Sequence, residues 1–167
     1  MELVNDEAVY ETGFMGYSYP LSNLQVENML NKWLTNENKQ YVIKFDSVEI
    51  GIAQISNIDH SNRVCEVGVL LLEEGQNKGI GHWAFQELTK ICFDRLDMYR
   101  IEARVKSNNI AASKILDKLN FSLDGVLRKT IYFKGDRIDL QVFGLLQDQY
   151  KSVKQKLQHE ELGLFPR

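Results

Sequence analysis

The spacing of apolar residues changes along the chain, and each change marks a predicted element. Ser22 and Gln25 form a capping-box pattern, and apolar residues then recur at helical spacing until about Asn36. The face of this helix that we expect to point inward consists of Leu24, Met29, Leu30, Trp33 and Leu34. From Tyr41 the period falls to two, which indicates strands instead.

Three strands are predicted in succession, at 41–45, 49–55 and 64–72. Polar turn residues at 46–47 and 57–62 separate them. Alternating segments joined by short polar turns are typical of an antiparallel meander. We therefore expect the three strands to be neighbours in one sheet.

The second half of the chain alternates helices with strands. A glycine-rich stretch at 75–81 opens a helix, a strand at 99–105 follows, and a second helix covers 109–119. Strands at 121–133 and 138–146 then form a hairpin. The inward faces of the two helices are predicted to hold Ile80, Trp83, Ala84, Leu88, Ile91 and Cys92 in the first, and Ala112, Ile115, Leu116 and Leu119 in the second. This order of elements predicts an α/β (α+β) layer fold around a mixed sheet.

Composition limits the class of protein. The 167 residues suit one domain, 1–167, with a polar tail at 149–167 in which 149–161 is predicted to be a solvated or partner-facing helix. A hydrophobic content of 44% with 26% charged residues excludes bulk disorder. The net charge of −3 argues against a nucleic acid or an anionic membrane as partner.

Cysteine, histidine and hydropathy patterns point to the cytoplasm. No apolar run approaches the roughly 18 residues of a membrane helix, and the acidic N-terminus is unlike a signal peptide. Cys65 and Cys92 form no CxxC pair, so we expect two reduced, buried thiols. Because His60, His82 and His159 lie far apart in sequence, we expect no metal site.

The stretch Gln-Asn-Lys-Gly-Ile-Gly at 76–81 is the strongest local motif. It follows a strand and opens a helix, where free N–H groups and the helix dipole favour an anion. Glycines allow the backbone to approach phosphate oxygens closely. The stretch lacks the Gly-Lys-Ser/Thr of a Walker loop and is not GxGxxG, which disfavours dinucleotide binding by a Rossmann fold. A glycine-rich turn without a ligand is the alternative.

This loop is one of an ordered set of segments. The others are the strand at 65–72, Val-Lys-Ser-Asn-Asn-Ile-Ala-Ala-Ser at 105–113, Leu-Asp-Lys-Leu-Asn-Phe at 116–121, Gly125 and Asp139. In this order and spacing, over roughly 19–146, the set resembles the GNAT superfamily of acyl-CoA-dependent N-acetyltransferases. The Asn-x-x-x-Ser and Leu-Asp-Lys-Leu-Asn-Phe patterns look most like the ribosomal-protein alanine and spermidine acetyltransferase subgroup. The resemblance implies a mostly antiparallel central sheet flanked by helices.

The resemblance also implies acetyl-CoA as co-substrate and a set of residues that bind it. The pyrophosphate would lie on Gln76, Asn77, Lys78, Gly79, Ile80 and Gly81. The pantetheine arm would pair with the backbone of Val69, Leu70 and Leu71. Asn109 would contact the pantetheine, or cap the following helix, or do both.

Two carboxylates are candidates for the base that deprotonates an acceptor amine. Glu66 shares a strand face with Gly68 and Leu70, where a lone carboxylate is costly unless it is paired or functional. Many members of the superfamily carry a glutamate on this strand. Glu102 lies on a charged face with Arg104, which suggests an open cleft. For both residues, an ion pair at the sheet surface is the alternative.

The sequence departs from the family pattern in two places. Leu116 stands where many members have a tyrosine that protonates the leaving thiolate. Ser113, one turn earlier, would have to act through water or would only cap, and Tyr132 is a more distant candidate. An acid is dispensable if the thiolate leaves unassisted, since a free thiol has a pKa of about 8.5. The family's first edge strand precedes the segment matching 5–9, and we expect it to be absent here.

Acetyl transfer from acetyl-CoA to a primary amine, by direct attack in a ternary complex, is the function these features favour. The acceptor would be a protein N-terminus, a polyamine or another small amine. A homodimer is expected on family analogy. Two alternatives remain open: a non-catalytic acyl-CoA-binding or sensing module, and a protein whose glycine loop binds another phosphate ligand.

Overall fold

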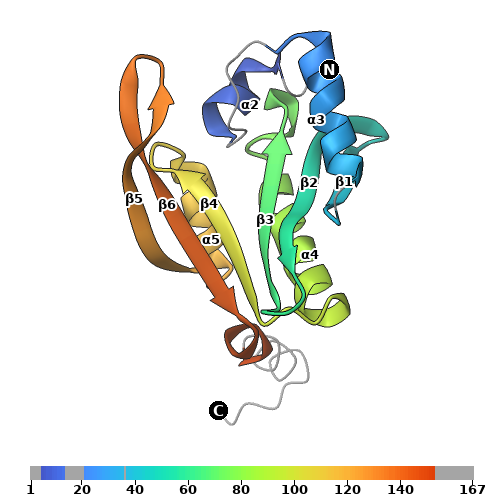
Figure 1. Ribbon diagram of the computed structural model, residues 1–167, viewed down its shortest axis with the longest axis vertical. Helices are drawn as coiled ribbons and strands as arrows, with labels where there is room; N and C mark the ends of the chain where they lie inside the picture. The colour runs from blue at the N-terminus through green and yellow to red at the C-terminus, as the bar shows by residue number, and fades with distance from the viewer. Residues whose placement is uncertain (1–4, 14–20, 36, 153–167) are drawn as a thin grey trace.

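The computed structural model describes residues 5–13, 21–35 and 37–152. Its centre is a six-stranded sheet with strand order β1-β2-β3-β4-β6-β5 (Figure 1). The strands are β1 (Lys39–Phe45), β2 (Val48–Asp59), β3 (Val64–Leu71), β4 (Arg100–Lys106), β5 (Ser122–Phe133) and β6 (Asp136–Leu146). The β3–β4 pair is parallel and the other four pairs are antiparallel. The predicted mixed, mostly antiparallel sheet is therefore confirmed.

Helices cover both faces of the sheet. They are α2 (Glu7–Thr12), α3 (Asn23–Thr35), α4 (Ile80–Lys90), which runs on as the π-helical turn η2 (Ile91–Arg95), and α5 (Ile110–Lys118), with a short 3-10 turn η1 (Glu73–Gly75). Figure 1 shows α4 and α5 behind the sheet, and α2 and α3 in front of one end of it. Across the described ranges, no helix is long and apolar enough to cross a membrane.

The main core lies between the sheet and the α4–α5 layer. Alternation along β3 and β4 turns Cys65, Val67, Ile101 and Ala103 toward the helices, and all four are buried. Leu116 of α5 is fully buried in the same cluster. The two thiols are buried and form no disulfide, as predicted. A hydrogen bond with Cys65, together with burial, raises the pKa of the Cys92 thiol well above its usual range.

Two predicted helix faces are rotated from the observed ones. In α4 the buried stripe includes Phe85, whereas Trp83 is 53% exposed. In α3, Met29 is buried as predicted, but Leu24 and Leu30 are exposed and Val26 turns inward instead. The side chains of Trp33 and Leu34 lie outside the described residues. These parts of the prediction were wrong because the apolar residues of both helices spread over a broad arc, so packing partners decide which part of it is buried.

Two helix caps form as predicted. The Ser22 backbone N–H donates to Gln25 Oε1 at 2.8 Å, and the Gln25 N–H donates back to Ser22 Oγ at 3.4 Å. Asn109 caps α5, since its Oδ1 accepts from the Ala112 N–H at 3.0 Å. These caps fix where both helices begin.

The edge strands of the sheet are β1 and β5. β1 forms one edge, and within the described residues no strand precedes it. Residues 147–152 at the other end of the chain are helical, and Tyr150 stacks on Phe93 with ring centroids 4.9 Å apart. The start of the predicted solvated helix at 149–161 therefore packs on the core, while 153–161 lie outside the described residues.

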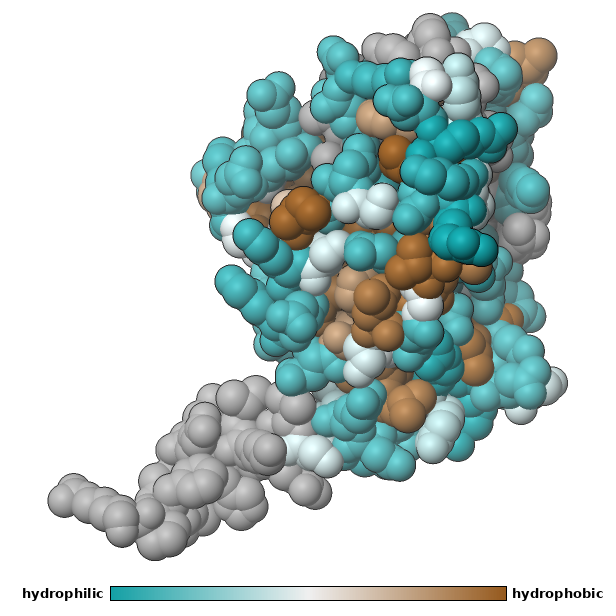
Figure 2. All heavy atoms as spheres, turned by 90° about the vertical axis from the view of Figure 1, so that its left-hand side faces the viewer, coloured by the Kyte–Doolittle hydropathy of each residue, from teal (hydrophilic) through white to brown (hydrophobic). Residues whose placement is uncertain are grey.

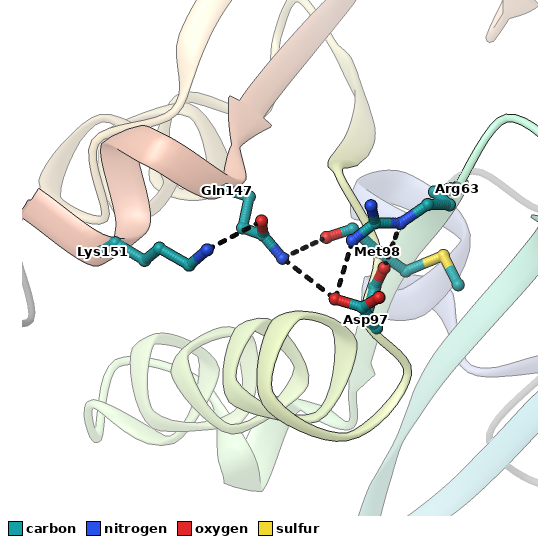
Figure 3. A network of polar contacts seen from close by, with 5 residues as sticks. All are labelled: Arg63, Asp97, Met98, Gln147 and Lys151. Atoms are coloured by element: carbon teal, nitrogen blue, oxygen red, sulfur yellow. Dashed lines mark hydrogen bonds and ion pairs between the residues drawn. The ribbon is translucent and has the colours of Figure 1, made fainter.

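A polar network joins the ends of three strands at the base of the sheet (Figure 3). Arg63, just before β3, donates to the carboxylate of Asp97 at 2.7 Å. Gln147, just after β6, donates to the carbonyl of Met98 at 3.2 Å and accepts from Lys151 at 2.9 Å. The network therefore holds β3, β4 and β6 together where they converge.

Replacing Gln147 with alanine is expected to lower the free energy of unfolding by about 1–3 kcal/mol, because the buried Met98 carbonyl loses its side-chain donor. Asp97→Ala breaks the ion pair of the same network, but both side chains are exposed, so we expect about 0–1 kcal/mol. Urea unfolding of both variants measures the difference. Equal losses would contradict the account based on burial.

Candidate active site

The parallel strands β3 and β4 pair over a short stretch only. Their register ends at Glu66 and Glu102, yet β3 runs on to Leu71 and β4 to Lys106. Figure 1 shows the two strands diverging from their shared base. Within the described residues, the β3 backbone from 67 to 71 therefore has no strand partner on its β4 side, and its polar groups there are open to a ligand.

A cavity of about 610 Å³, which we call the large cavity, lies on the α4–α5 side of this divergence. It is lined by Val69, Leu71, Gln76, Asn77, Gly79, Gly81, His82, Phe85, Asn109, Ala111, Ala112, Lys114, Ile115 and Lys118. Most of the predicted cofactor-binding residues are thus brought together. The exceptions are Leu70, which is buried, Ile80, which packs in the core, and Lys78, whose ammonium lies 5.5 Å from the centroid of the Phe45 ring.

The glycine loop has the backbone geometry of an anion site. Gly79 caps α4 with φ of +77°, and Asn77 also has a positive φ. The first helical bond joins the Trp83 N–H to the Gly79 carbonyl at 3.1 Å, so the preceding N–H groups have no partner within the helix. Gln76 Nε2 donates to the Leu71 carbonyl at 3.1 Å and ties the loop to the end of β3.

The α5 side of the large cavity holds lining residues that were not predicted from the sequence. Lys114 and Lys118 both line it, one turn apart on the helix. Ala112 and Phe85 also line it. The four-residue spacing of the lysines after the Asn109 cap was a signal that could have revealed their shared face, whereas nothing in the sequence marks Phe85 as a cavity residue.

A small cavity of about 60 Å³ lies between β3 and β4. It shares Val69, Phe85, Asn109 and Ala112 with the large cavity, so the two adjoin. Its other lining residues include Gly13, Gln54, Glu66, Gly68, Leu70 and Arg104. The alternation of β3 puts Glu66, Gly68 and Leu70 on the face opposite α4 and α5. The two cavities together therefore lead from one face of the sheet to the other.

Glu66 is partnered. Its Oε2 accepts from Asn57 Nδ2 at 3.1 Å and lies 3.5 Å from Arg104 Nε, and the side chain is 18% exposed. Ser56 lies directly opposite it on β2. The ion pair that the sequence left open as the alternative is therefore present, because the bulged end of β2 and the neighbouring β4 surround Glu66 with polar groups. Glu66 still lines the small cavity.

Glu102 lies beside Glu66 on the next strand but lines neither cavity. Its carboxylate forms an ion pair with Arg100 at 3.0 Å, and Arg100 also contacts Asp124 at 2.7 Å. Burial tends to lower the pKa of Arg100, but hydrogen bonds to Asp124 and Glu102 outweigh it, so the pKa lies above the usual value. The geometry of Glu102 is that of the salt-bridged alternative.

The candidates for an acid lie away from the cavities. Ser113 Oγ is within hydrogen-bond distance of Gln141 Oε1 (2.9 Å) and of the Asn109 carbonyl (3.2 Å), and it lines neither cavity. Leu116 is fully buried, and Tyr132 is 66% exposed on β5. In the described part of the chain, the lining of the two cavities includes no tyrosine.

Known proteins are similar to this chain in sequence. A profile of the acetyltransferase (GNAT) domain matches residues 1–122. The chain is 31% identical to the uncharacterized N-acetyltransferase p20 of Bacillus licheniformis over 78% of this chain and 70% of that protein. It is 23% identical to the spermidine N(1)-acetyltransferase of Escherichia coli (strain K12), over 76% of this chain and 69% of that one.

A protein of known structure has a fold similar to that of this chain. The crystal structure of spermidine N-acetyltransferase from Vibrio cholerae in complex with CoA and spermine superposes with a TM-score of 0.81 at 21% identity. The match covers 90% of this chain and 89% of that one. Together with the domain profile, which spans most of the sequence, these findings establish that the chain belongs to the GNAT family of acetyl-CoA-dependent N-acetyltransferases.

Proposed function

We propose that this chain transfers the acetyl group of acetyl-CoA to a primary amine by direct attack within a ternary complex. The observation that carries the proposal is the pair of adjoining cavities on opposite faces of the sheet. A donor in the large cavity and an acceptor beside Glu66 would approach each other through the gap between β3 and β4. Both can then be bound at once, so no acetylated enzyme is needed.

The large cavity fits acetyl-CoA in size and in chemistry. At about 610 Å³ it lies within the range of ligand pockets. The N–H groups at the start of α4 would receive the pyrophosphate, and the free edge of β3 at 69–71 would pair with the amides of the pantetheine arm. Lys114 and Lys118 place two cations on the rim, where the 3′-phosphate would gain from them.

Glu66 acts as the base in this proposal. It removes one proton from the acceptor ammonium, directly or through a water molecule. The amine nitrogen then forms a bond to the thioester carbonyl carbon, and the C–S bond breaks with its electron pair going to sulfur. The nitrogen loses its second proton as the amide forms, and this proton accounts for the one that converts the CoA thiolate to the thiol. We assign no residue to that protonation, because a thiol with a pKa of about 8.5 is a tolerable leaving group.

We further propose that the protein is a homodimer located in the cytoplasm. Apolar atoms gather in the middle of the face that Figure 2 shows. On β5, an edge strand of the sheet, Leu123, Val126 and Leu127 are exposed. This surface supports a homodimer. Two buried cysteines that form no disulfide support a reducing compartment such as the cytoplasm.

Initial rates measured against acetyl-CoA and an amine test the mechanism. With alaninamide or spermidine as acceptor, we expect double-reciprocal lines that intersect, because both substrates must be bound before the acetyl group moves. Incubation with labelled acetyl-CoA alone should leave no label on the protein. Parallel lines with a labelled enzyme would indicate a covalent intermediate instead. Binding of acetyl-CoA without turnover of either amine would favour a sensing module.

A further inference from the structure

We call the part of the small cavity on the α2 side the acceptor mouth. It is lined by Gly13, Gln54, Glu66, Gly68, Leu70 and Arg104. Gly13 follows α2 and lies against Leu70, since a Cβ added there would be 2.6 Å from Leu70 Cδ2. Gly68 lies opposite Gln54. The mouth therefore contains one carboxylate, one guanidinium and one amide among apolar and glycine positions.

Charges in the acceptor mouth are balanced. Arg104 Nε is 3.5 Å from Glu66 Oε2, so the carboxylate and the guanidinium lie side by side. Glu102, beside Glu66 on β4, and Asp124 both pair with Arg100. An acceptor with several ammonium groups would need several available carboxylates along its length. Among the described residues, the lining of the mouth offers Glu66 alone.

The α2 side of the mouth is balanced in the same way. Glu7 and Glu11 of α2 both form ion pairs with Lys134 in the β5–β6 turn. The buried ammonium of Lys106 lies 3.4 Å from the Glu11 carbonyl and 4.7 Å from the centroid of the Phe133 ring. No excess of negative charge for a polycation arises from these described groups.

We propose that the acceptor is an α-amino carbonyl compound, the group shared by amino acids and peptide N-termini, and that Arg104 determines this specificity. An amine and a carbonyl oxygen on adjacent carbons lie about 3 Å apart, which matches the separation of Glu66 and Arg104. The amine faces Glu66, and the carbonyl or carboxylate oxygen accepts from the Arg104 guanidinium. This inference rests on the proposed transfer reaction and on Glu66 facing the amine.

The alternative is that Arg104 acts only by restraining the Glu66 side chain, with which it forms an ion pair. The two roles differ in their effect on acceptors. Loss of a restraint on the base slows transfer to every amine by the same factor. Loss of a carbonyl-binding group slows only those acceptors that carry a carbonyl oxygen.

The test compares kcat/KM for alaninamide, free alanine, an alanine-initiated peptide, propylamine and spermidine. In the wild type, we expect the carbonyl-bearing acceptors to exceed propylamine and spermidine. Arg104→Gln should lower kcat/KM about tenfold for the carbonyl-bearing acceptors and by less than about threefold for propylamine. Arg104→Lys, which keeps the charge, should fall between. Arg128→Gln on β5, an exposed arginine outside both cavities, is the matched control and should change nothing.

The results distinguish an amino acid from a peptide as acceptor, and failure of this inference from failure of the transfer reaction. Free alanine above the peptide would identify an amino acid as the source of the α-amino carbonyl group, and the reverse order would identify a peptide N-terminus. Spermidine above alaninamide in the wild type, or an equal loss for every acceptor in Arg104→Gln, would overturn the inference. Calorimetric binding of acetyl-CoA with no acetylation of any of the five amines would overturn the transfer reaction itself.

Discussion

Replacing Glu66 with glutamine is expected to lower kcat by about 10²–10⁴-fold, the usual contribution of a general base. The amide has the size of the carboxylate, and its oxygen can still accept from Asn57, whose Nδ2 lies 3.1 Å from Glu66 Oε2 in the wild type. It cannot take a proton from an ammonium. Because Glu66 lines the small cavity and not the large one, acetyl-CoA affinity should stay within about twofold of wild type.

The measurement pairs kcat at saturating acetyl-CoA with calorimetric Kd values for the same preparation. Glu49→Gln supplies the matched control, since Glu49 is exposed and pairs with Lys44 away from both cavities. Full turnover in Glu66→Gln would exclude Glu66 as the base. If Glu102→Gln then showed the large loss, the base would move to Glu102, despite its ion pair with Arg100.

Local signals in the sequence were enough to predict the order of elements. Asp46 and Ser47 both have positive φ in the turn between β1 and β2, which is the conformation expected of a two-residue hairpin. The Ser22 and Asn109 caps set helix starts to within a residue. Element ends were less accurate, because β2 continues to Asp59 through a stretch predicted to be a turn. Its bulge after Ser56 lets a strand contain turn-like residues.

Features that depend on distant partners could not be predicted. The period of β4 does put Glu102 and Arg104 on one charged face, but it says nothing of the register between β3 and β4. The Glu66–Arg104 contact joins residues on two strands whose pairing stops at Glu66. Ser113 has a family-like position in sequence, yet it turns toward Gln141 of β6 instead of a cavity. In each case a long-range contact decides the role.

Enlarging Ala112 is expected to weaken acetyl-CoA binding about 100-fold. Ala112 lines both cavities and lies where they adjoin, together with Val69, Phe85 and Asn109. In Ala112→Leu the added carbons would occupy space beside a cavity of only about 60 Å³. Overpacking costs about 1–3 kcal/mol, and each 1.4 kcal/mol is tenfold in affinity. Stability should change little, because Ala112 is half-buried at an open cavity.

A graded series separates steric blocking from general damage. Ala112→Ser, which adds one oxygen, should bind acetyl-CoA nearly as wild type, Ala112→Leu much more weakly, and Ala112→Phe more weakly still. Adenosine 3′,5′-bisphosphate, which has no pantetheine arm, should bind all three variants alike, since it would need only the glycine loop and the lysine rim. If Ala112→Leu bound acetyl-CoA as wild type does, the pantetheine arm would not run past Ala112 between β3 and α5. The thioester would then not reach Glu66 through the gap between β3 and β4, where the two cavities adjoin.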